Sequence, residues 1–170
     1  PVPAAAPWAE DMHTIGVTGT NGKTSTTSML AAIVRAAGLR VFAATTEPEA
    51  IEQWWGPLGT TAVVERMDVR PGGAWRFVLR EPDGGESAFH GTFREVVAPE
   101  RIVQTFEWEG MPGHVSVETA TYEDLGGRTR LVTTSVFPTR EERDGMLASG
   151  MEQGMRETYG RLDDLLARGG

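Results

Sequence analysis

A glycine-rich turn that carries the only lysine of the 170-residue chain is its clearest chemical motif. The stretch from residue 15 to residue 25 reads Ile-Gly-Val-Thr-Gly-Thr-Asn-Gly-Lys-Thr-Ser. We predict a strand over His13–Thr18 before the turn and a helix over about Thr24–Ala37 after it, where Met29, Leu30, Ile33 and Val34 have helical spacing. A strand, a glycine-rich loop and a helix in that order are the setting of a phosphate-binding loop.

The chemistry expected of this loop is the binding of a nucleotide phosphate. Gly19 and Gly22 would let backbone amides turn inward, and the helix N-terminus would add partial positive charge. Lys23 would reach the terminal phosphates, and the Thr24 hydroxyl would hold magnesium if a magnesium nucleotide binds. The predicted phosphate site therefore consists of Gly19, Thr20, Asn21, Gly22, Lys23, Thr24 and Ser25. ATP and Mg²⁺ are its candidate ligands, and no cofactor is firmly implied by the sequence.

The motif departs from the general phosphate-loop form, because Val17 stands where that form has a glycine. The tighter form Thr18-Gly-Thr-Asn-Gly-Lys-Thr-Ser25 resembles the ATP site of Mur ligases and folylpolyglutamate synthetases, over about residues 10–41. That family also uses a magnesium-binding glutamate, a further active-site lysine and a base-binding domain. This chain has no second lysine, so the resemblance implies weak phosphate binding and excludes Mur-type ligase activity.

Composition excludes several other classes of function. The chain has no cysteine, so it has no disulfide, thiolate nucleophile or cysteine-bound metal. Sixteen basic residues against 24 acidic ones give a net charge of −8, which argues against a nucleic-acid partner. No apolar run is long enough to span a membrane. We interpret residues 1–10 as a linker and not a signal peptide, and we expect a cytoplasmic protein.

The rest of the chain has the alternating pattern of an antiparallel sheet, followed by a long helix. Strands are predicted over Thr61–Val69, Ala74–Arg80, Ser87–Val97, Arg101–Glu109, Val115–Glu123 and Thr129–Phe137. Leu39–Ala44 fits either a strand or a helical turn. The final helix begins with Thr139 as its N-cap, is expected to break near Gly150, and has an apolar stripe at Leu147, Met151, Met155, Tyr159, Leu162 and Leu166.

Four ordered motifs in this part resemble the SRPBCC or START-like superfamily, in the branch named after the activator of the heat-shock chaperone ATPase. They are Glu47–Pro57 with its Trp-Trp pair, Met67–Phe77, His90–Val96 followed by Pro99–Ile102, and the glycine-rich Ser149–Gly154. The similarity covers about residues 41–167. It implies an α+β helix-grip fold, in which a curved antiparallel sheet closes on a long C-terminal helix.

Together the two resemblances predict a chimera joined around Arg40–Thr46. Its parts are a linker at 1–10, a strand–loop–helix segment at 11–46 and a ligand-binding domain at 47–170, packed as one globular unit. In this interpretation the phosphate-loop strand and helix replace the usual first strand and helix of the fold. The strand His13–Thr18 would then take the first-strand position in the sheet.

A sheet with one apolar face must bury that face, and a strongly curved sheet leaves room for a ligand under the helix. The predicted cavity residues are Trp55, Trp75, Phe77, Phe93, Trp108, Met151, Met155 and Tyr159. No catalytic constellation is evident, so the main hypothesis is a non-enzymatic protein that binds a small hydrophobic molecule. Two alternatives remain open: weak nucleotide binding at Gly19–Thr24, and a cyclase- or aromatase-type enzyme that works inside the cavity.

Overall fold

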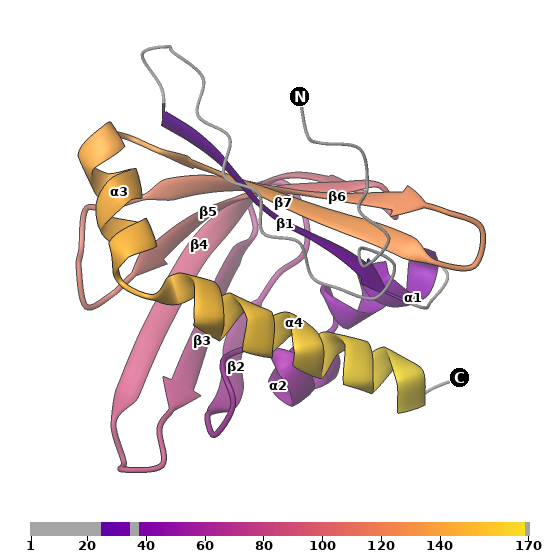
Figure 1. The fold of residues 1–170 in the computed structure, drawn as a ribbon, viewed down its shortest axis with the longest axis horizontal. Coiled ribbons are helices and arrows are strands. Elements are labelled where there is room, and N and C mark those ends of the chain that lie inside the picture. The colour runs from indigo at the N-terminus through magenta and orange to yellow at the C-terminus, as the bar shows by residue number, and fades with distance from the viewer. Residues whose placement is uncertain (1–24, 35–37, 169–170) are drawn as a thin grey trace.

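The computed structural model describes residues 25–34 and 38–168, which form one antiparallel sheet and the helices that cover it (Figure 1). The seven described strands pair in the order β1-β7-β6-β5-β4-β3-β2. They are β1 (Ser25–Val34), β2 (Thr61–Met67), β3 (Ala74–Arg80), β4 (Glu86–Val97), β5 (Arg101–Trp108), β6 (Ser116–Asp124) and β7 (Thr129–Phe137). This α+β architecture confirms the antiparallel sheet and the long C-terminal helix that the sequence predicts.

Strands β2 to β7 form where the side chains alternate between a buried and a more accessible face. In β7 every second residue from Thr129 to Phe137 is buried, and the residues between them are half-buried. Register shifts between Val64 and Arg66 and between Phe93 and Glu95 interrupt the pairing of neighbouring strands. Such irregularities bend the strands, which helps the sheet to curve around its apolar face.

The helix predicted over Thr24–Ala37 is wrong, because Ser25–Val34 is the strand β1, paired antiparallel with β7. A short apolar run fits a helix or a strand equally well by periodicity, and here pairing along the edge of β7 decides between them. The position beside β7 in the described sheet belongs to β1. The prediction that His13–Thr18 takes the first-strand position falls on residues that the structure does not describe. Residues 13–24, which include most of the phosphate loop, lie outside the described residues.

Four helices are described, and the last two meet at Gly150. They are α1 (Gly38–Ala44), α2 (Pro48–Trp54), α3 (Arg140–Ala148) and α4 (Met151–Arg168). α1 settles the ambiguous segment as helical. Thr139 caps α3, since its hydroxyl oxygen accepts a hydrogen bond from the Glu142 amide at 3.1 Å. Gly150 has φ +81°, a conformation that favours glycine, and this breaks the helix where the sequence predicts.

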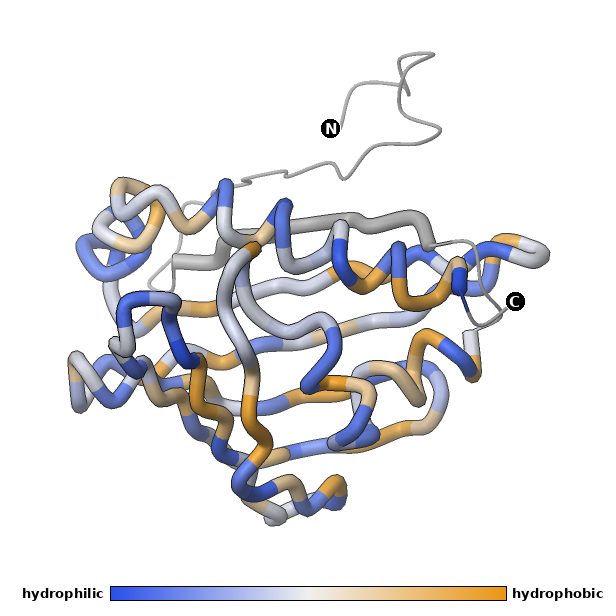
Figure 2. Tube along the Cα trace, turned by 90° about the horizontal axis from the view of Figure 1, so that it is seen from below, coloured by the Kyte–Doolittle hydropathy of each residue, from blue (hydrophilic) through white to orange (hydrophobic). Residues whose placement is uncertain are grey.

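α4 lies across the sheet with its apolar side inward. Figure 2 shows hydrophobic positions on the side of α4 that faces the sheet and hydrophilic ones on the opposite side. Its buried residues are Tyr159, Leu162 and Leu166. The predicted stripe is thus confirmed in the C-terminal half of the helix, whereas α3 has no buried residue.

Arginine side chains fasten α4 to the segments around it. The Arg161 guanidinium donates hydrogen bonds to the carbonyls of Gly56 at 3.0 Å, Pro57 at 3.1 Å and Gln53 at 3.2 Å. Arg40 in α1 donates to the Leu166 carbonyl at 3.1 Å. Together these bonds hold α4 against α1, α2 and the turn that leads into β2. None of the described helices is long and apolar enough to cross a membrane.

Candidate functional site

A partly open cavity of about 110 Å³ lies between the inner face of the sheet and the helices α2 and α4. Its walls come from α2, strands β2 to β7, α4 and Thr45, which directly follows α1. The lining residues are Thr45, Ile51, Trp54, Trp55, Met67, Phe77, Phe93, Ile102, Gln104, Glu118, Ala120, Tyr122, Leu131, Thr133 and Tyr159. An apolar cavity of ~150 Å³ holds benzene, so this smaller, partly open space suits a short alkyl chain, or a single ring that extends into the opening.

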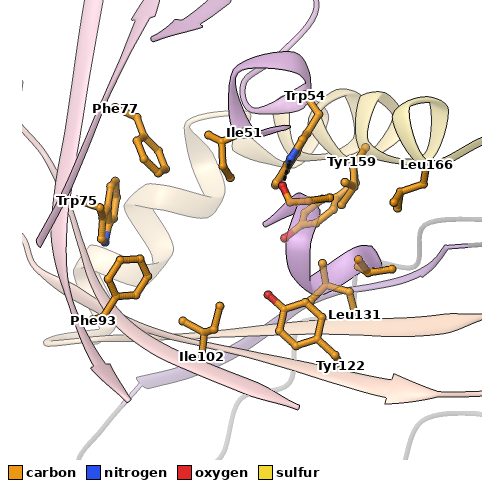
Figure 3. Close-up of a cluster of buried hydrophobic side chains, with 13 residues drawn as sticks. Ile51, Trp54, Trp75, Phe77, Phe93, Ile102, Tyr122, Leu131, Tyr159 and Leu166 are labelled. Atoms are coloured by element: carbon orange, nitrogen blue, oxygen red, sulfur yellow. Dashed lines mark hydrogen bonds between the residues drawn. The ribbon is translucent and has the colours of Figure 1, made fainter. Parts of the chain in front are cut away.

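Aromatic and aliphatic side chains form most of the wall. Figure 3 shows Phe77 and Phe93 on one side of the space, Ile51 and Trp54 from α2 above it, and Ile102 below it. Trp55 meets the edge of Phe77 with ring centroids 5.2 Å apart. The rings are held by tight packing, since Phe93 is only 2% exposed and Phe77 only 5%. A pre-formed apolar wall of this kind favours ligands without charge over most of their surface.

The β6 residue Glu118 gives the cavity one acidic group. Its carboxyl accepts hydrogen bonds from Gln104 Nε2 at 3.3 Å and from Ser135 Oγ at 3.4 Å. The side chain is surrounded by protein, and its accessible part borders the cavity. Burial raises the pKa of Glu118 above its ordinary value, and the two hydrogen bonds only partly oppose that effect.

Two tyrosine hydroxyls lie on the same wall, each paired with a threonine. Tyr122 OH lies 2.6 Å from Thr45 Oγ1, and Tyr159 OH lies 3.0 Å from Thr133 Oγ1. Burial raises the pKa of Tyr122, and it raises the pKa of Tyr159 to about 12. Both phenols therefore stay protonated at neutral pH, where they donate and accept hydrogen bonds and do not act as nucleophiles.

The arrangement can bind a molecule that is apolar over most of its surface and polar at one end. Among residues 25–34 and 38–168, no cluster of histidine, aspartate and glutamate could hold a metal ion. Ser25, the last residue of the predicted phosphate site, begins the strand β1 and does not follow a helix start. The described residues therefore do not provide the helix N-terminus that a phosphate loop uses.

Four of the eight predicted cavity residues line this space: Trp55, Phe77, Phe93 and Tyr159. They come from α2 or its end, β3, β4 and α4, so the predicted fold brings them together from four elements. Their contact with a ligand stays a prediction.

The other four predicted cavity residues are not among those that line this space. Trp75 is buried against Phe77 and Phe106, with ring centroids 4.8 and 5.9 Å away. Trp108, at the end of β5, is 39% exposed and borders a surface depression. Met155 packs against the core without lining the cavity, and Met151 is half-buried at the start of α4. An inward strand position or helix stripe therefore did not suffice to place a side chain at the void.

The polar residues of the cavity wall were not predicted from the sequence, although the strand pattern around Glu118 indicates them. Glu118 shares its strand parity with Ala120 and the buried Tyr122, so alternation places a carboxyl on the inner face. An acidic residue at an inward position is uncommon and indicates a special environment. Gln104 and Thr133 occupy equivalent inward positions on the neighbouring strands. Gln104 on β5 is in register with Glu118, and Thr133 on β7 is in register with Ala120.

Comparison with known proteins assigns the family. The family model described as "Activator of Hsp90 ATPase homolog 1-like protein" matches residues 36–167, so the match begins before the predicted domain start at residue 47. A comparison with curated proteins finds no match.

Solved structures from several bacteria share the fold. A solution structure of a protein from Arthrobacter aurescens is 30% identical, with a TM-score of 0.78 over 84% of this chain and 86% of that chain. A Rhodobacter sphaeroides protein is 25% identical, with a TM-score of 0.80 over 88% of this chain and 96% of that one. A Mycobacterium smegmatis protein, at 24% identity and a TM-score of 0.79 over 91% and 97%, has the same fold. The chain belongs to the family of activator of Hsp90 ATPase homolog 1-like proteins.

Proposed function

We propose that this protein binds a compact, largely apolar small molecule in the cavity beneath α2 and α4. The observation that carries the proposal is the space of about 110 Å³, walled by ordered aromatic and aliphatic side chains and partly open to solvent. Small-molecule sites are typically concave, mostly apolar and supplied with a few polar groups that orient the ligand. The chain also belongs to the family of activator of Hsp90 ATPase homolog 1-like proteins, and its α+β helix-grip fold supports the same proposal.

The size of the cavity limits the ligand and its affinity. By comparison with benzene in a cavity of ~150 Å³, the enclosed space of about 110 Å³ holds about four or five non-hydrogen atoms, so a ligand of about seven or eight atoms must extend into the opening. We expect a Kd of about 0.1–1 mM, equal to about −5.5 to −4 kcal/mol. Divided by the number of non-hydrogen atoms in the ligand, this binding free energy stays below the limit of about 1.5 kcal/mol per atom that the best very small ligands reach. A natural ligand that extends out of the opening would bind more tightly.

Calorimetric titration with toluene tests the proposal. We expect one site per chain and a negative heat-capacity change, because apolar surface is removed from water on binding. The control is Ala120→Leu, whose larger side chain would occupy the cavity and reduce the affinity at least tenfold. Absence of binding up to the solubility limit of toluene would overturn the proposal.

The remaining hypotheses have different support. Magnesium-nucleotide binding at Gly19–Thr24 stays a prediction, since those residues lie outside the described part of the chain. A cyclase or aromatase would need groups that move protons on a substrate, and the wall offers one carboxyl and two protonated phenols. No observation on the described residues favours either alternative over binding.

A further inference from the structure

The polar side chains that line the cavity offer more hydrogen-bond acceptors than free donors. Glu118 contributes a carboxyl, and the pairs Thr45–Tyr122 and Thr133–Tyr159 contribute hydroxyl oxygens that can each accept a further hydrogen bond. The side-chain amide of this region, Gln104 Nε2, uses one of its two N–H groups to donate to Glu118. A ligand group placed here is therefore matched best if it donates several hydrogen bonds.

The charge of this end favours a cation over a neutral donor. A neutral hydroxyl or amide would need only acceptors, which the threonine and tyrosine oxygens supply without any charge. Glu118 adds an acidic group that accepts hydrogen bonds from Gln104 and Ser135, and no described arginine or histidine forms an ion pair with it. The rings of Trp54 and Tyr159, 6.2 Å apart, also line the cavity, and aromatic rings of this kind attract cations.

We propose that the cavity selects small aralkyl or alkyl amines, with the ammonium group bound by Glu118 and the apolar body held by the aromatic wall. This inference rests on the proposed function, because it specifies the chemistry of the molecule bound in the same cavity. Three N–H donors of a primary ammonium match the carboxylate and the neighbouring hydroxyl oxygens. The net charge of −8 supports the attraction of cations to the whole chain.

The proton balance of this binding is defined by the groups that face Glu118. Gln104 from β5 and Ser135 from β7 hydrogen-bond to Glu118. The other polar residues that line the same cavity are Thr133 from β7, Tyr159 from α4, Tyr122 from β6 and Thr45, which directly follows α1. The two tyrosines are the other titratable groups in this set, and their raised pKa values keep them neutral. Binding of an ammonium ion favours the ionised form of Glu118, so any proton that the empty site holds there is released to the buffer. Affinity for the amine should rise with pH through the pKa of Glu118, until the amine itself loses its proton.

The test compares toluene, benzyl alcohol and benzylamine, which share one ring and differ in the polar group. Calorimetry at pH 7 measures the three affinities for the wild-type chain and for Glu118→Gln, an isosteric change that removes only the charge. The matched control is Glu123→Gln, which removes the same charge from an exposed position on the same strand. We expect benzylamine to bind at least tenfold more tightly than benzyl alcohol to the wild type and to Glu123→Gln. In Glu118→Gln the two should bind within about twofold of one another.

Each outcome separates this inference from the proposed function. Toluene or benzyl alcohol binding without a preference for benzylamine, or a preference that survives in Glu118→Gln, overturns the amine assignment and leaves the proposed function standing. Failure of all three compounds overturns the proposed function, and the amine assignment with it. If Glu118→Gln does not fold, the wild type alone decides. Benzylamine affinity that rises with pH beside a constant affinity for benzyl alcohol supports the assignment, and equal pH profiles overturn it.

Discussion

Filling the cavity from its floor should stabilise the protein and prevent ligand binding. Ala120 lies at the middle of β6, in register with Ile102 on one side and Thr133 on the other, and all three line the cavity. The substitution Ala120→Leu adds three carbons at this point. Burial of each carbon contributes about 0.8 kcal/mol, and ordering the new side chain costs about 0.5–1 kcal/mol. We expect the free energy of unfolding to rise by about 1–2 kcal/mol.

Whether Ala120→Leu raises or lowers the free energy of unfolding shows whether there is empty space beside Ala120. Placing extra carbons in a filled core costs about 1–3 kcal/mol, because side chains and backbone must move. Ala62 in β2 provides the control: it is 3% exposed and does not line the cavity, so Ala62→Leu should destabilise by that amount. Urea unfolding measures both variants. Destabilisation of Ala120→Leu as large as that of Ala62→Leu would show that no usable space exists beside Ala120.

Three further substitutions test the electrostatics of the wall and the attachment of the helices. Glu118→Gln should raise the free energy of unfolding at pH 7 and leave it unchanged well below the ordinary pKa of 4.5. The reason is that the pKa of Glu118 is raised in the folded chain, so ionisation of this carboxyl costs stability as pH increases. A difference between variant and wild type that stays constant across pH would contradict the burial of this charge. Arg161→Met should cost about 1–3 kcal/mol in urea unfolding, because it leaves the carbonyls around Gly56 without their donor; a loss below ~0.5 kcal/mol would mean that water replaces the guanidinium. Thr139→Ala should cost about 1 kcal/mol by removing the cap of α3, and Thr139→Ser should restore most of it; equal stability of both variants would exclude the cap as the cause.

The strands were predictable because alternation is a local property of the sequence. β3 and β7 begin and end where the pattern predicts, and the cap at Thr139 and the break at Gly150 follow from residue type. The segment Ser25–Val34 was assigned to a helix because its apolar spacing fits both structures, and its partner strand lies about a hundred residues later in the chain. Local periodicity contains no information on such a long-range pairing.

The wall of the cavity was only half predictable for a related reason. Strand parity indicates which side chains point inward, but a void exists only where inward side chains fail to meet the helices above them. Trp75 is inward and packed between rings, whereas Glu118 is inward and borders the space. That difference depends on where α2 and α4 lie over the curved sheet, which the pattern of one strand does not specify.

The most direct test of the cavity is a methyl NMR titration of the wild-type chain with toluene. Ile51, Ile102 and Leu131 place methyl groups on the wall from three different elements, and the exposed Leu39 and Leu58 provide reference methyls outside it. Binding in the cavity predicts saturable shifts, with one common Kd of about 0.1–1 mM, for the three wall residues and none for the two reference residues. Shifts confined to the exposed leucines, or no saturable shift in Ile51, Ile102 and Leu131, would contradict the proposal that this cavity is the ligand site.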